Sequence, residues 1–165
     1  ASSVVADTIN VPAGGDIQAA INGASNGDII QLEAGNYLPA ATLGTNGKEV
    51  TLIGTTDSKS GAPTSIIDGQ ASIRVLFCGN GETALTVFEN LLITGGLAEG
   101  SWPDNVGGGM YNYSSSPTVT NCTFSGNTVN YDGGGMANYN GGSPAMTNCT
   151  DRILVQYQLS QLLPT

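Results

Sequence analysis

The chain has 165 residues, a length that fits one domain over 1–165, with 24 glycines and only 10% charged residues. Its four basic and thirteen acidic side chains give a formal net charge of −9, and because nucleic acids bind through clusters of Lys and Arg, no nucleic-acid partner is expected. No stretch approaches 18 consecutive apolar residues, so no membrane span is expected either.

Residues 8–27 are predicted to form an N-terminal cap. Thr8 to Pro12 has the composition of a short strand. Residues 16–24 place apolar side chains on one face of a short helix, which Asp16 favours at its start and Gly23 ends. Such a helix would cover the unpaired backbone groups at the end of a stack of strands.

Short strands separated by turns are predicted to follow. The sequence between them is rich in Gly, Asn, Ser and Pro, which favours turns over helices. A turn is expected at 35–37, a polar loop at 55–64 and a longer loop at 95–109. The predicted strands cover 28–32, 50–53, 65–67, 74–78 and 85–94.

The stretch from 107 to 150 contains nearly the same unit twice. Each copy begins with Gly-Gly-Gly-Met and ends with Asn-Cys-Thr, and Met110 to Met136 spans 26 positions. Internal repetition at such a period is typical of a solenoid, whose units are stable only when stacked on one another. The units have short strand-like runs and no helical periodicity, so we predict an all-β chain, a parallel β-helix with coils over 28–150.

Aligning the coils predicts columns of equivalent side chains. The asparagines that end each strand run should stack at a turn, where Asn tolerates the left-handed conformation, and the residues after them should form an interior column. Glu49 and Val50 are expected at the head of these two columns, and Leu52 above Ile93. The predicted structural ladder is Asn90, Asn121, Asn148 with Leu91, Cys122, Cys149.

Cys122 and Cys149 are interpreted as small inward-facing apolar residues, because neighbouring parallel strands offer a poor approach for a disulfide. A disulfide bridge or a metal site are the alternatives. The chain has no His, and the cysteine spacing lacks the ligands of a zinc site, so no metal and no cofactor are expected.

The chain resembles the right-handed parallel β-helix superfamily of pectin lyases, pectin esterases and their non-catalytic relatives. Residues 16–21, 27–37 and 50–54 resemble the cap and first coils of the polysaccharide enzymes, whereas the Gly-Gly-Gly-Met-x-Asn and Asn-Cys-Thr units resemble repeats of bacterial surface proteins of the adhesin type. The resemblance implies a single-stranded, right-handed β-helix with a short N-terminal capping helix, in a secreted or cell-surface protein.

A catalytic site is not predicted. A polysaccharide lyase needs a basic residue to remove a proton, and Arg74 is the only basic residue between Lys59 and Arg152. It has no second cation or aspartate pair one coil away, so we expect it to be a surface charge or a partner of Asp68. The alternative is a truncated or degenerate polysaccharide lyase or esterase.

Binding through exposed aromatic side chains is the favoured function. Aromatic faces beside Asn and Asp suit sugar rings, and the candidates are Trp102, Tyr111, Tyr113, Tyr131 and Tyr139. The expected partner is a polysaccharide or a cell-surface protein. The alternative is that the tyrosines shield turns.

The last residues, 151–165, depart from the repeat. They contain no Gly and alternate apolar residues with polar ones. They are interpreted as an atypical C-terminal cap or as a fragment end, and an apolar cap there suggests a homodimer formed through this end of the chain.

Overall fold

The computed structural model describes residues 5–152, which form short strands and one short helix. All pairings between the named strands are parallel. The elements are β1 (Thr8–Val11), α1 (Ile17–Gly23), β2 (Ile29–Leu32), β3 (Gly35–Tyr37), β4 (Leu43–Gly44), β5 (Thr51–Ile53), β6 (Ser65–Asp68), β7 (Leu76–Cys78), β8 (Val87–Glu89), β9 (Leu91–Thr94), β10 (Leu97–Ala98), β11 (Met110–Tyr113), β12 (Thr118–Thr120), β13 (Thr123–Ser125), β14 (Thr128–Val129), β15 (Met136–Tyr139), β16 (Ala145–Thr147) and β17 (Thr150–Arg152).

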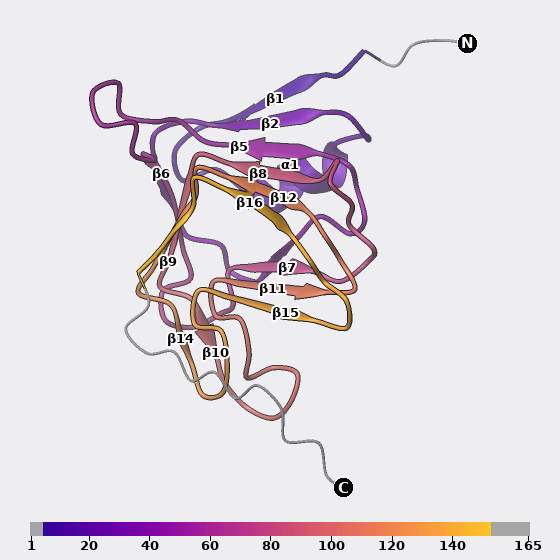
Figure 1. Ribbon diagram of the computed structural model, residues 1–165. Coiled ribbons are helices and arrows are strands. Elements are labelled where there is room, and N and C mark those ends of the chain that lie inside the picture. The colour runs from indigo at the N-terminus through magenta and orange to yellow at the C-terminus, as the bar shows by residue number, and fades with distance from the viewer. Residues whose placement is uncertain (1–4, 153–165) are drawn as a thin grey trace, which may run out of the picture.

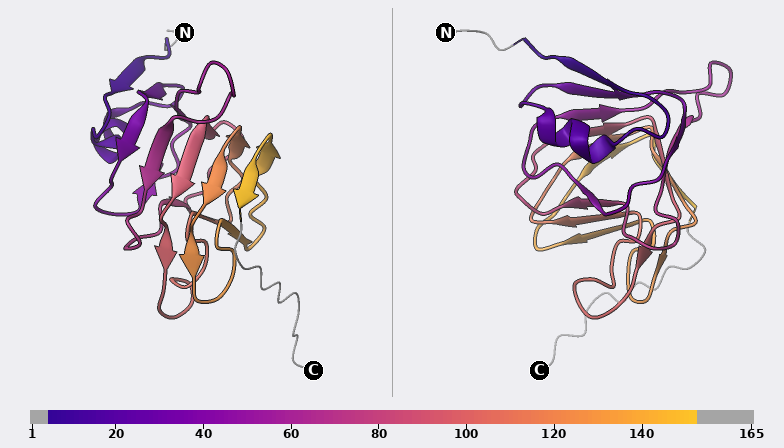
Figure 2. Two further views of the ribbon diagram at one scale, coloured as in Figure 1. Left: turned by 90° about the vertical axis from the view of Figure 1, so that its left-hand side faces the viewer. Right: turned by 180° about the vertical axis from the view of Figure 1, so that it is seen from behind.

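The strands build three main sheets, in the orders β1-β2-β5-β8-β12-β16, β17-β13-β9-β6-β3 and β15-β11-β7-β4 (Figure 1). From β2 onward, strands that follow one another in the chain lie in different sheets, so the chain visits each main sheet in turn and returns one strand further along (Figure 2). We call each such circuit a pass. A small sheet of β10 and β14 lies beside the main ones. The prediction of stacked parallel strands with a single short helix is confirmed.

The core consists of inward-facing columns that run from pass to pass. In the six-stranded sheet Leu52 lies beside Phe88, which lies beside Val119. In the five-stranded sheet Ile67 and Phe124 flank Ile93 in the same way. These side chains are almost completely buried, and each such burial stabilises the fold by about 1.5–3 kcal/mol.

The corner between these two sheets is an asparagine ladder. Asn90, Asn121 and Asn148 adopt left-handed backbone conformations with φ of 56°, 49° and 56°. Asn121 Nδ2 donates to Asn90 Oδ1 at 2.8 Å, so the Asn90 amide oxygen is satisfied from the next pass. In the adjoining column Leu91 and Cys122 are buried, and Cys149 packs against the same core while partly buried.

The predicted start of these columns is wrong. Leu52 pairs with Phe88 instead of joining the Ile93 column, and Ser65, not Val50, precedes Leu91. Gly54, not Glu49, lies next to Asn90, whose Nδ2 donates to the Gly54 carbonyl oxygen at 3.5 Å. The turn predicted at 35–37 is also a strand, β3, which pairs with β6.

Helix α1 lies across the N-terminal end of the stack, as the right-hand view of Figure 2 shows. Asp16 caps it, with Oδ1 accepting from the Ala19 N–H at 2.9 Å, and Ile17 and Ile21 are buried beneath it. At its other end Lys48 Nζ donates to the carbonyl oxygens of three residues, Ile21, Asn22 and Ala24.

Replacing Lys48 by methionine is expected to lower the free energy of unfolding by about 1 kcal/mol, because the last carbonyls of α1 lose a cationic donor. Urea unfolding followed by circular dichroism measures the change. Lys59→Met is the matched control, since Lys59 is exposed in a distant turn. Equal effects of the two variants would contradict a capping role for Lys48.

A buried carboxylate connects three successive passes. Glu82 is 3% exposed and accepts hydrogen bonds from Thr45 Oγ1 (2.8 Å), the backbone N–H groups of Gly47 and Asn80 (both 2.9 Å) and Ser115 Oγ (2.9 Å). Burial acts to raise its pKa, but these hydrogen bonds together lower it below the ordinary value.

The interpretation of 151–165 as a cap or fragment end, and of a homodimer through it, lies largely outside the described residues, which end at Arg152 in β17. Between residues 5 and 152 no helix is long and apolar enough to cross a membrane.

Candidate functional site

The outer face of the sheet β15-β11-β7-β4 carries an aromatic surface. Along β11, Met110 belongs to the main core whereas Tyr111 belongs to a separate cluster, as expected for side chains that alternate across a sheet. Tyr111 stacks on Phe77 of β7 at 5.6 Å between ring centroids and meets Tyr139 of β15 edge-on at 6.0 Å.

The loop 99–107 is fastened beside this surface by Arg74. The Arg74 guanidinium donates to the carbonyl oxygens of four loop residues, with distances of 2.8–3.3 Å: Pro103, Asp104, Val106 and Gly107. It also lies 4.8 Å from the Tyr111 ring centroid, a cation–π contact. Burial lowers the pKa of Arg74. Electrostatic interactions with nearby Asp104 and Tyr111 act in the opposite direction and raise this pKa. Arg74 is therefore a fastening for the loop, and its prediction as a surface charge or a partner of Asp68 is wrong.

Three aromatic side chains meet at a hollow of about 430 Å³, lined by Trp102, Asn105, Tyr131 and Tyr139. We call it the aromatic hollow. Trp102 from the loop contacts Tyr139 edge-on, with centroids 4.6 Å apart and ring planes at 75°. Trp102 and Tyr131 are each 52% exposed, so two large apolar faces are open to a ligand.

Polar groups lie in the lining of the aromatic hollow and next to it. The Tyr139 hydroxyl donates to Asp132 Oδ2 at 3.2 Å, and burial together with Asp132 raises the pKa of Tyr139 to about 12. Asn105 Oδ1 and the Tyr111 hydroxyl are buried without a hydrogen-bond partner among the described residues. Unpaired polar atoms of this kind are uncommon in a folded chain and mark positions where a ligand can supply the partner.

The sequence candidates divide into three groups. Trp102, Tyr131 and Tyr139 come together at the aromatic hollow. Tyr111, expected at the surface, is 2% exposed beneath them, and Tyr113 is 40% exposed but does not line the hollow. Asn105 was missed, because a single Asn in a glycine-rich loop carries no signal that separates it from a turn residue.

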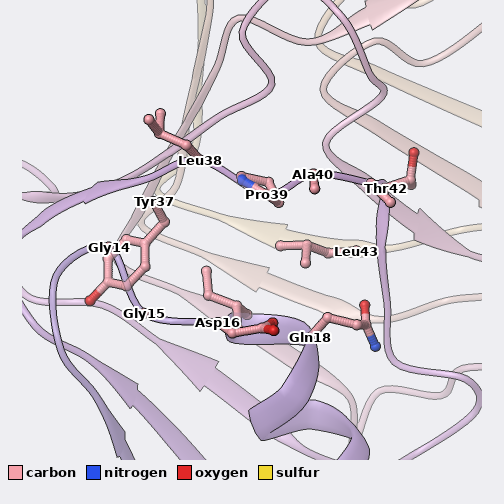
Figure 3. Close-up of a pocket in the computed structure, with 12 residues that line it drawn as sticks. Gly14, Gly15, Asp16, Gln18, Tyr37, Leu38, Pro39, Ala40, Thr42 and Leu43 are labelled. Atoms are coloured by element: carbon pink, nitrogen blue, oxygen red, sulfur yellow. The ribbon is translucent and has the colours of Figure 1, made fainter.

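A second hollow, of about 370 Å³, lies between residues 14–18 and 37–43 (Figure 3). Its polar groups are used within the fold. The Tyr37 hydroxyl is within 2.9 Å of the Val11 carbonyl oxygen and 3.0 Å of that of Glu33, and the Gln18 amide bonds both backbone groups of Gly44. Asp16 caps α1. This hollow is therefore a feature of the cap and a weaker candidate.

The thiols of Cys78 and Cys122 contribute no reactive group. The three cysteines are free, and burial raises the pKa of Cys122 to about 12 and that of Cys78 still further, so both stay protonated at neutral pH. Within residues 5–152 no group of three or more acidic or thiol side chains is arranged to hold a metal ion.

No protein-family model matches the chain, and neither a curated protein nor a solved structure matches it at a significant level.

Proposed function

We propose that the chain is a right-handed parallel β-helix of a secreted or cell-surface protein, and that it binds carbohydrate at the aromatic hollow without catalysis. The order in which the chain visits its three sheets supports a helical path. The right hand follows from the strong preference of crossovers between parallel strands. The resemblance of its repeats to those of bacterial surface proteins supports the location.

The observation that carries the binding proposal is the convergence of Trp102, Tyr131 and Tyr139 on one hollow. Pyranose rings present apolar C–H faces that pack on indole and phenol rings, and their hydroxyls pair with amide and carboxylate groups. Asn105 lines the hollow, and Asp132 accepts a hydrogen bond from the lining residue Tyr139, so an amide and a carboxylate lie at this position. The volume of about 430 Å³ lies within the range of small-ligand sites.

The geometry does not favour a lyase. The basic residue that such an enzyme would use is Arg74, and its guanidinium is already directed at the loop carbonyls and the Tyr111 ring. A group held in this way is poorly placed to remove a proton from a substrate. We therefore propose binding in place of turnover.

Replacing Trp102 or Tyr131 by alanine is expected to weaken carbohydrate binding by about tenfold or more, since each removes one stacking face, worth about 1.5–2 kcal/mol. The measurement is a glycan array followed by calorimetric titration of the hits. Tyr113→Ala is the matched control, because Tyr113 is an exposed tyrosine on the same sheet outside the hollow. The proposal is wrong if Tyr113→Ala weakens binding and the other two substitutions do not.

A further inference from the structure

We infer that the aromatic hollow selects uncharged sugar units and excludes polyanionic glycans. This inference rests on the proposed function and adds the chemical class of the ligand. It is carried by the charges and hydrogen-bonding groups around the hollow.

The charges beside the hollow are negative. Asp132 accepts a hydrogen bond from Tyr139, which lines the hollow. Asp104 and Glu99 belong to the loop that carries Trp102. The whole chain has a formal net charge of −9, so the field beyond the hollow has the same sign. An anionic polymer approaching Trp102 would meet repulsion at short and long range.

The cationic side chains that the structure describes offset this only in part, because Arg74 keeps its charge beside the loop while its donors are occupied. Arg74 directs its donors at the loop carbonyls, Lys48 caps α1, and Lys59 lies in the turn after β5. The segments 1–4 and 153–165 contain no Lys or Arg in their sequence.

The hydrogen-bonding groups point the same way. Asn105 Oδ1 lacks a donor, and the Asp132 carboxylate accepts hydrogen bonds only. A sugar hydroxyl can donate to both, whereas the carboxylate of a uronic acid has no proton to offer at neutral pH. A uronate keeps its ring hydroxyls, so the two kinds of unit differ at the carboxylate, which Asp132 repels and which an uncharged pyranose lacks.

The test uses affinity electrophoresis of the full chain at low ionic strength in gels containing soluble polysaccharides. The panel pairs neutral and acidic polymers on the same backbone, hydroxyethyl cellulose with carboxymethyl cellulose and xylan with glucuronoxylan, and adds glucomannan, galactan, polygalacturonate and alginate. At least one neutral polymer is expected to retard the chain, and retardation should be lost in Trp102→Ala. The acidic partner of a bound neutral polymer should bind at least tenfold more weakly.

A charge variant sharpens the test. Asp104→Asn removes one charge from the loop that carries Trp102 without changing a residue that lines the hollow, so it should bind the acidic partner several-fold better than the wild type and leave neutral binding unchanged. Glu33→Gln removes the same charge from an exposed residue in the N-terminal passes and should change neither.

Binding of an acidic polymer that equals or exceeds that of its neutral partner, and that Trp102→Ala abolishes, would overturn the inference while supporting carbohydrate binding. Retardation of the neutral polymers that Trp102→Ala leaves unchanged would refute the hollow as the site, and a complete lack of retardation would refute the proposed function; the inference fails with either.

Discussion

Replacing Glu82 by alanine is expected to lower the free energy of unfolding by about 4 kcal/mol, more than the replacement of either Lys48 or Arg74. The reason is that four donors from three passes, two hydroxyls and two backbone N–H groups, converge on one buried carboxylate. Removing it leaves all four facing a cavity. Equilibrium unfolding in urea at pH 7 measures the loss.

The same carboxylate should make stability depend on acidity. The folded pKa of Glu82 is lowered, so its contribution is fully present above the unfolded pKa of about 4.3 and is lost as the pH falls through the folded pKa. Glu82→Gln has no charge to titrate, so the difference in stability between wild type and Glu82→Gln should shrink as the pH falls below about 4.3.

Glu33→Gln serves as the reference for this experiment, since Glu33 is exposed. Its stability curve should run parallel to the wild type through the acid range. If the free energies of unfolding of the wild type and Glu82→Gln differ by the same amount from pH 6 to pH 3, the Glu82 charge does not hold the three passes together.

Replacing Arg74 by alanine is expected to weaken carbohydrate binding at the aromatic hollow by about thirtyfold, roughly 2 kcal/mol, and to destabilise the fold by about 2–3 kcal/mol. The guanidinium supports four carbonyl groups of the loop that carries Trp102 and Asn105. Without it the loop loses its fixed position, and the hollow loses two of its four lining residues.

Calorimetric titration with the neutral glycan that binds the wild type measures the first effect, and urea unfolding measures the second. Arg74→Lys keeps the charge but not the planar fork of donors, so it should recover only part of the binding. Uronate-release and ester-release assays on the wild type complete the experiment. Turnover of an acidic polysaccharide by the wild type would contradict the non-catalytic proposal.

Much of the architecture followed from the repeats. Their period, the short strand-like runs and the absence of helical periodicity predict stacked strands, and the pattern of Ile17 and Ile21 after Asp16 predicts the one helix. These signals are local, and each is repeated or strongly patterned. Predictions from repeated patterns hold in the folded chain because every pass packs against its neighbours in the same way.

The register of the early passes did not follow from the sequence. Thr51–Ile53 and Leu91–Thr94 have the same alternation of inward and outward side chains, yet they lie in different sheets. A period of two distinguishes the faces of a strand and cannot say which sheet the strand joins. Only the position of the turns, which vary in length between passes, decides this.

The site was predicted by residue type more than by position. Aromatic residues indicated binding, but whether a given tyrosine is exposed depends on the loop that covers it. Arg74 illustrates the limit, because its partners are carbonyl groups 29 to 33 positions away. Backbone acceptors leave no mark in the sequence that a pairing argument could use.

The contacts of Glu82 also restrict how this array can have grown. Solenoids lengthen by duplication of whole units, and each added unit displaces its neighbours by about 4.8 Å along the stack. A copy inserted between Thr45 and Ser115 would pull the donors away from their shared carboxylate, whereas a copy made after Ser115 would leave them together. Duplication is thus tolerated outside the stretch from Thr45 to Ser115, and the second of the two near-identical units, 133–150, lies there.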